Sequence, residues 1–161
     1  MEKILVMGVG NILLGDEGLG VHAVEYMKKQ SLPAFVDLLD GGTGGFHLLT
    51  LMFDYKKMIL IDATLDDSPV GTMQVIKPRY SKDFPRALTT HDIGLKDLLD
   101  TATVLDHLPE IILIVVSIDP KQEIGMELSP EILKTLPQVY EQVLIQAEKL
   151  KIEVISESIS L

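Results

Sequence analysis

The sequence contains no cysteine. The chain can therefore form no disulfide, ligate no iron–sulfur cluster, offer no thiolate to a metal and use no cysteine nucleophile. Any metal that binds must rely on oxygen and nitrogen ligands.

Long apolar runs are also missing, although hydrophobic residues make up 47% of the chain. No run has the length of a membrane-spanning helix, and the first residues lead directly into an apolar strand without a signal-peptide pattern. Acidic residues outnumber basic ones, and the formal net charge is −10. This charge would repel the phosphates of a nucleic acid, although the alternative is that it only keeps the protein surface soluble. We expect a cytoplasmic protein with no nucleic-acid partner and no membrane insertion.

Short apolar runs alternate with amphipathic segments along the chain, which is typical of an α/β sheet covered by helices. We expect one domain over residues 1–155, with residues 156–161 as a frayed tail. The sheet should be twisted, five-stranded and mostly parallel, with helices on both faces. The expected strands are Lys3–Gly8, Phe35–Leu39, Lys57–Ile61, Thr72–Lys77 and Ile111–Ile118.

Two of these strands have expected positions in the sheet. The Thr72–Lys77 strand should be an antiparallel edge strand, because the link before it is too short for a helical crossover. The Ile111–Ile118 strand is the most apolar and should be central.

Amphipathic segments predict the helices between and after the strands, namely Glu17–Lys29, Leu48–Phe53, Asp92–Thr101 and a last helix after Ser129. Ser129 should cap that last helix, with Pro130 at its first position. Pro137 should break or kink it ahead of an apolar stripe that begins at Val139.

The stretch GVGNILLGDEGLG follows the first expected strand, where dinucleotide-binding proteins carry G-x-G-x-x-G. The third glycine position of that fingerprint falls on Leu13. Asp16 and Glu17 also place negative charge where a pyrophosphate would bind. These departures favour a cation over a nucleotide phosphate.

Carboxylates gather at the expected carboxyl ends of the strands, where open α/β sheets form their ligand sites. Asp16 and Glu17 follow the first strand, Asp40 ends the second, Asp62 the third and Asp119 the last. Such a group of like charges favours a bound cation.

Most of these carboxylates also have a structural interpretation. Asp16 could cap the first helix, and Glu17 could be a first-turn charge that the dipole of this helix favours. Asp40 and Asp119 could each stabilise a turn. Asp62, within IDAT, is the hardest to explain in this way.

The sequence has four histidines, of which His91 in TTHDIGL opens an expected helix after a long loop that can reach the strand ends. His22, His47 and His107 are interpreted as surface or packing residues. One histidine and two carboxylates leave coordination positions open for groups of a substrate, and they do not select one divalent metal.

Four motifs in order resemble those of the hydrogenase maturation endopeptidases. They are GVGNILLGDEGLG at Gly8–Gly20, DGGTGG at Asp40–Gly45, LIDA at Leu60–Ala63 and TTHDIGL at Thr89–Leu95. The resemblance implies an endopeptidase that trims the C-terminal extension from the large-subunit precursor of nickel–iron hydrogenases. It also implies a twisted mixed sheet between helices.

Carried over motif by motif, the resemblance implies metal contacts from Glu17, Asp62 and His91, with Asp40 lining the cleft as a further catalytic residue. The metal is expected to be nickel that the substrate carries, and zinc or cadmium are expected to bind the same ligands. The glycines Gly8, Gly10 and Gly15 should turn the backbone sharply and deliver Glu17 to the strand ends.

The chemistry is only partly determined by these residues. The sequence lacks both G-x-S-x-G and H-E-x-x-H, so serine and zincin mechanisms lack their motifs. Attack by water, with Asp40 or Glu17 taking its proton, fits the residues present. The alternatives are a docking or chaperone module for the nickel-loaded subunit and, less consistent with the loop, a nucleotide-binding domain.

Overall fold

The computed structural model describes residues 2–43, 47–78, 100–101, 104–105 and 109–159, with only the backbone of residues 47, 49 and 153–159. Five strands form one sheet in the order β2-β1-β3-β5-β4. Their bounds are Ile4–Val9 (β1), Val36–Gly42 (β2), Lys57–Thr64 (β3), Met73–Ile76 (β4) and Glu110–Ser117 (β5).

Four of these strands are parallel, and β4 is an antiparallel edge strand paired with β5. The expected sheet, including its antiparallel edge, is therefore confirmed. The middle position is held by β3 and not by β5, which is an interior strand beside the edge. Both strands are buried nearly throughout, so hydrophobicity alone could not rank them.

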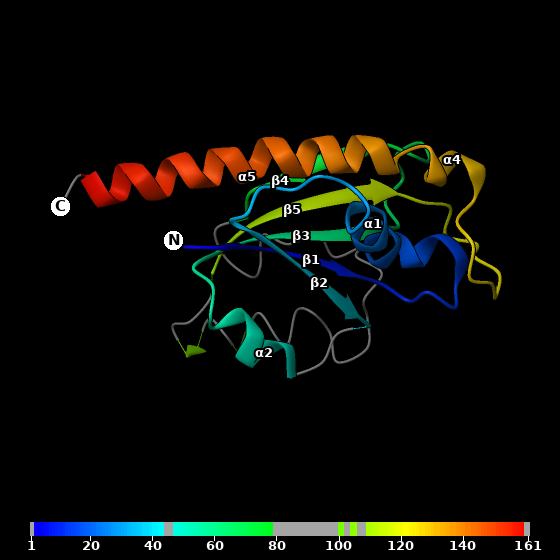
Figure 1. Ribbon diagram of the computed structural model, residues 1–161. Coiled ribbons are helices and arrows are strands. Elements are labelled where there is room, and N and C mark those ends of the chain that lie inside the picture. The colour runs from blue at the N-terminus through cyan, green and yellow to red at the C-terminus, as the bar shows by residue number, and fades with distance from the viewer. Residues whose placement is uncertain (1, 44–46, 79–99, 102–103, 106–108, 160–161) are drawn as a thin grey trace.

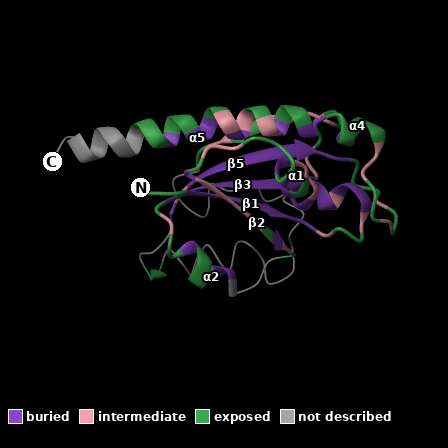
Figure 2. Ribbon diagram, in the orientation of Figure 1, coloured by how far each residue is buried: buried purple, intermediate pink, exposed green. Residues whose placement is uncertain are grey.

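Helices cover both faces of the sheet, as expected (Figure 1). They are α1 (Leu19–Met27), preceded by the 3-10 turn η1 (Gly15–Gly18), α2 (His47–Met52), α4 (Pro130–Leu133) and α5 (Leu136–Ile159). One apolar cluster joins α1 and α5 to the sheet and a second joins α2 to the opposite face. Figure 2 shows the sheet buried between these two layers. The helix expected over 92–101 falls almost wholly outside the described residues.

The last two helices start as the sequence predicts. The Ser129 hydroxyl accepts a hydrogen bond from the Ile132 N–H, and Pro130 is the first residue of α4. The helix breaks before Pro137, which lies in the first turn of α5, where its missing N–H has no partner to lose. The α5 helix continues to Ile159, into the segment expected to fray.

The buried side of α5 carries the expected apolar stripe, which includes Val139, Val143, Ala147 and Leu150. This stripe packs against the sheet beside α1. In the described part of the chain, no helix has the length and apolar character needed to cross a membrane.

Candidate active site

The carboxyl ends of β1, β2 and β3 meet around Gly8. This residue pairs with Asp40 of β2 on one side and with Ile61 of β3 on the other. Asp62 follows Ile61 directly, so Asp40 and Asp62 flank the end of β1 from opposite sides. The register therefore brings two of the expected site residues to one edge of the sheet.

Glycines let the segment after β1 pack closely against these strand ends. A Cβ atom at Gly8 would overlap the Gly20 carbonyl, and one at Gly20 would overlap the carbonyl of Ile61. A Cβ atom at Gly10 would overlap the carbonyl of Glu17, and Gly10 itself has a φ of 147°. Glycine is required at these close approaches, which hold η1, with Glu17, over the sheet edge.

The expected role of the glycines needs one correction. Gly10 and Gly15 do occupy conformations with positive φ, the second at 53°. Gly8 instead lies within β1, next to a shift in the register with β2, and its lack of a side chain lets α1 approach. The sequence motif therefore combines turn glycines with packing glycines.

Asp62 is fully buried, at 0% exposure, and lies inside β3 rather than at its end. Its Oδ1 accepts a 2.8 Å hydrogen bond from the Ala63 N–H, among its contacts. Because strand side chains alternate, Asp62 lies on the same face as Met58 and Leu60, the face that α2 covers. A buried carboxylate is costly unless hydrogen bonds or a charge stabilise it, which makes Asp62 the strongest functional candidate among the described carboxylates.

Asp40 is exposed and, like Asp62 in its strand, lies two residues before the last residue of β2 rather than at its end. Its Oδ1 accepts a 2.8 Å hydrogen bond from the Gly42 N–H. This bond supports the turn interpretation, while the position beside Gly8 keeps the carboxylate at the strand ends. Glu17 is half-buried in η1 and has interactions with its surroundings.

Asp16 does not cap the first helix, since neither η1 nor α1 has a side-chain cap. Its carboxylate, 5% exposed, accepts 2.7 and 2.8 Å hydrogen bonds from the Ser129 N–H and hydroxyl. Its own N–H donates to the side-chain oxygen of Gln122. The residue thus fastens the loop before α4 to the loop after β1, a role that local sequence does not reveal.

The remaining candidates are divided between structural roles and undescribed residues. Asp119 accepts a hydrogen bond from the Lys121 N–H and stabilises a turn, as its alternative interpretation predicted. The Nε2 atom of His22 is buried and has no hydrogen-bond partner among the residues that the structure describes. His91 and His107 lie outside the described residues, and of His47 only the backbone is described.

Within the described ranges, no three histidine, aspartate or glutamate side chains are close enough to hold a metal ion. His91, which would complete the expected set with Glu17 and Asp62, is not among them. The expected metal site is therefore still a prediction.

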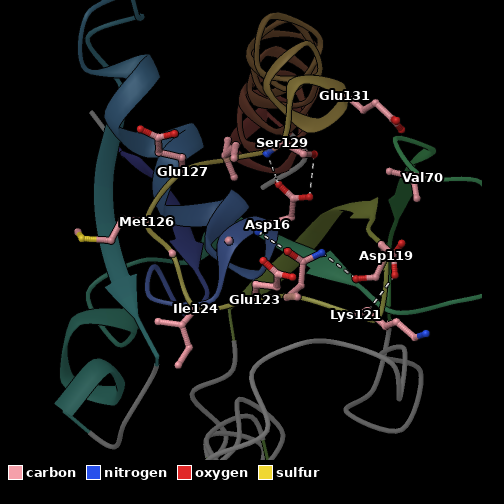
Figure 3. Close-up of a pocket in the computed structure, with 14 residues that line it drawn as sticks. Asp16, Val70, Asp119, Lys121, Glu123, Ile124, Met126, Glu127, Ser129 and Glu131 are labelled. Atoms are coloured by element: carbon pink, nitrogen blue, oxygen red, sulfur yellow. Dashed lines mark hydrogen bonds between the residues drawn. The ribbon is translucent and has the colours of Figure 1, made fainter.

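A hollow of about 790 Å³ lies between residues 15–16, which directly precede Glu17 in the chain, and the segment 119–131 (Figure 3). Its lining includes Asp16 and Ser129, which face each other across their two hydrogen bonds. No sequence motif predicted this hollow. Its one signal was the cluster of acidic and apolar residues between Asp119 and Glu131, which contains no family motif.

The clearest shifted pKa values belong to groups at the opposite, amino end of the sheet. Burial raises the pKa of the Glu110 carboxyl, but hydrogen bonds from Lys57 and Lys77 outweigh it, so the pKa lies below its ordinary value. The Tyr55 hydroxyl likewise lowers the pKa of Asp37. Burial and the bond to Asp37 raise the pKa of Tyr55 to about 12.

Comparison with known proteins shows which protein family this chain is similar to. The family model HycI, described as hydrogenase maturation protease, matches residues 21–146. The hydrogenase 2 maturation protease of Escherichia coli is 33% identical over 156 residues, covering 95% of each chain. The hydrogenase expression/formation protein HupD of Rhizobium leguminosarum is 38% identical over 111 residues, which cover 67% of this chain and 55% of that protein.

The fold is also shared with solved structures. The hydrogenase maturating endopeptidase HybD of Escherichia coli superposes with a TM-score of 0.79 at 34% identity, over 91% of this chain and 93% of that one. The HybD maturation protease of Thermococcus kodakarensis has a TM-score of 0.75 at 24% identity, which shows a similar fold and nothing more.

Proposed function

The chain belongs to the hydrogenase maturation protease family, and we propose that it cuts the C-terminal extension from the nickel-loaded large-subunit precursor of a nickel–iron hydrogenase. The observation that supports this proposal best is the meeting of Asp40 and Asp62 around Gly8, with η1 packed over the same edge. This arrangement offers the exposed carboxylate of Asp40 at an edge that a bound peptide can reach, and it places the buried carboxylate of Asp62 on the other side of Gly8.

We propose that Glu17, Asp62 and His91 contribute ligands to the nickel that the precursor already carries. Two carboxylates and one imidazole are oxygen and nitrogen donors that divalent nickel accepts, but they cannot remove it from a site rich in thiolates. Sharing the metal would test the maturity of the substrate, because only a loaded precursor gains this binding energy and has its extension positioned for attack. The isolated protein should bind zinc or cadmium weakly through the same donors.

The proposed reaction is hydrolysis of one peptide bond. A water molecule adds to the scissile carbonyl carbon while Asp40 or Glu17 accepts its proton. The carbon–nitrogen bond then breaks, and the departing amine takes up a proton. In this sense the enzyme is an aspartic-type endopeptidase whose substrate supplies the metal.

The proposal is tested with purified precursor in nickel-loaded and metal-free forms. Chelator-treated enzyme should release the C-terminal peptide, detected by mass spectrometry, from the loaded form alone. The His91→Ala variant should fail on loaded precursor, whereas His107→Ala, a histidine outside the four motifs, should retain activity. Efficient cutting of the metal-free precursor would refute the nickel requirement.

A docking or chaperone module is distinguished in the same assay. Such a module would bind loaded precursor tightly and release no peptide under any condition. Isothermal titration of wild type and His91→Ala with zinc gives an independent reading of the ligand set. Equal zinc affinity in the two proteins would remove His91 from it.

A further inference from the structure

A network of hydrogen bonds between segments that are distant in the sequence joins the two sides of the hollow. The Gly125 N–H donates to the Leu13 carbonyl at 2.9 Å, and the Gly15 N–H donates to the Gly125 carbonyl at 2.8 Å. Gln122 bridges the Asp16 N–H and the Asp119 carbonyl. The segment 119–131 is therefore fixed in place, so its exposed side chains are displayed on an ordered surface.

Apolar side chains are exposed on this ordered segment. Ile124 and Met126 flank the bridging Gly125 and are 89% and 60% exposed, and Leu13 beside them is 55% exposed. Figure 3 shows the first two as part of the lining of the hollow. Large apolar side chains grouped on a rigid surface are typical of a binding site.

The hollow also carries a strong excess of negative charge. Its lining includes five carboxylates and one lysine. Asp16 is satisfied by Ser129, and Glu123, Glu127 and Glu131 form no ion pair with any residue that the structure describes. A segment that fills the hollow should therefore bring positive charge of its own.

We propose that this hollow binds the C-terminal extension of the precursor, as a basic segment with apolar side chains. The inference rests on the proposed function, because the precursor supplies the extension. Asp16, which lines the hollow, directly precedes Glu17. In this proposal, the mature portion of the precursor is anchored at the nickel, and the departing portion beyond the scissile bond enters the hollow that Asp16 lines.

Binding can be measured without cleavage by fluorescence anisotropy on the full chain. The probe is a fluorescein-labelled decapeptide of alternating lysine and leucine, compared with one of alternating glutamate and leucine. Glu123→Gln/Glu127→Gln should weaken binding of the lysine peptide about tenfold at about 50 mM salt. The matched control Glu141→Gln/Glu148→Gln removes the same charge from exposed positions of α5 and should change affinity less than about twofold. Equal effects of the two double variants would overturn the proposal, since they would mean attraction to the whole acidic chain.

The apolar contribution has its own matched pair. Ile124→Ser should weaken binding of the lysine–leucine peptide several-fold. Ile152→Ser, at an exposed position of α5, should leave the affinity for this peptide unchanged. Sedimentation velocity on the same proteins detects the other possible occupant. A wild-type dimer that Ile124→Ser converts to a monomer would assign the hollow to a second copy of the chain and overturn the proposal.

Kinetics on the loaded precursor separate this inference from the proposed function. If wild type cuts the precursor, the Glu123→Gln/Glu127→Gln variant should raise KM with little change in kcat. An unchanged KM would overturn the role of the hollow while leaving the protease proposal intact. A wild type that cuts no precursor, yet binds the lysine peptide through the hollow, would instead refute the proteolytic function.

Discussion

The two ends of the sheet hold their charges in different ways. At the amino end, Glu110 lies between Lys57 and Lys77, at 2.7 and 3.1 Å, and Asp37 lies 3.2 Å from Lys3. At the carboxyl end, Asp40 accepts a hydrogen bond from the Gly42 N–H, and Asp16 from the N–H and hydroxyl of Ser129. Among the described residues, neither Asp40 nor Asp16 belongs to an ion pair.

This difference separates charges that stabilise the fold from charges available for chemistry. A carboxylate neutralised by lysine lowers the energy of the folded chain but offers little to a ligand. A carboxylate held by neutral donors keeps its negative charge for a cation or for a proton. Substitutions at the amino end should therefore change stability, and those at the carboxyl end should change activity.

The largest effect is expected for Asp62→Asn, which should lower kcat/KM on loaded precursor by about a hundredfold or more. The amide has nearly the shape of the carboxyl group and keeps an oxygen for the Ala63 N–H, so thermal stability should change little. Cleavage assays beside thermal melting measure both. The control is Asp66→Asn, because Asp66 accepts hydrogen bonds from Ser68 and Ser117 nearby and should tolerate the change. Normal cleavage with a lowered melting temperature would make Asp62 a structural residue.

Asp40→Ala should follow, with a loss of about tenfold or more in kcat/KM. The loss of the turn hydrogen bond to Gly42 should cost no more than about 1 kcal/mol of unfolding free energy. The companion Asp40→Asn keeps an oxygen for that bond and removes the charge. Full activity in Asp40→Asn would show that the turn, and not the charge, is what the enzyme needs.

Glu110→Gln should change stability instead, lowering the free energy of unfolding by about 1–2 kcal/mol after allowance for solvent screening. The cause is that Lys57, which is 5% exposed, would lose the charge of Glu110 at 2.7 Å. Urea unfolding measures the effect, and Glu2→Gln, which breaks the exposed pair with Lys56, should change stability very little. Loss of cleavage by fully folded Glu110→Gln would contradict the division between the two ends.

The sequence predicted the sheet well because burial leaves a local pattern. Each expected strand is present, and even the antiparallel edge followed from the short link before Met73. It could not rank β3 against β5, since both are buried nearly throughout and their order depends on pairing between distant strands.

The carboxyl-end site was predicted less completely. The gathering of Asp40 and Asp62 at the carboxyl ends was expected for parallel strands, whereas the partner of Asp16 lies 113 residues away and leaves no local signal. The hollow has the same origin, because it forms between segments that only the tertiary fold brings together. A pattern of spacing within one segment cannot reveal such contacts.

The smallest effect is expected for Tyr55→Phe, which removes the 2.7 Å hydrogen bond to Asp37 at the amino end. At neutral pH the variant should lose about 0.5–1 kcal/mol of unfolding free energy, and its cleavage activity should not change. The phenol is the largest cause of the lowered pKa of Asp37, so NMR titration should find that pKa closer to its ordinary value of 3.8 in the variant.

The pH dependence of that small difference tests the same pair from both sides. Because folding lowers the pKa of Asp37, this carboxylate stabilises the fold fully above pH 3.8. Its contribution to the free energy of unfolding is lost as the pH falls through the pKa of the folded state. Folding raises the pKa of Tyr55 from 10.0 to about 12. The contribution of Tyr55 to the free energy of unfolding is therefore complete below pH 10.0 and is lost as the pH rises toward about 12. The gap in unfolding free energy between wild type and Tyr55→Phe should therefore be widest between these limits and narrow beyond each. A gap that does not vary with pH would mean that the phenol stabilises the fold by packing alone.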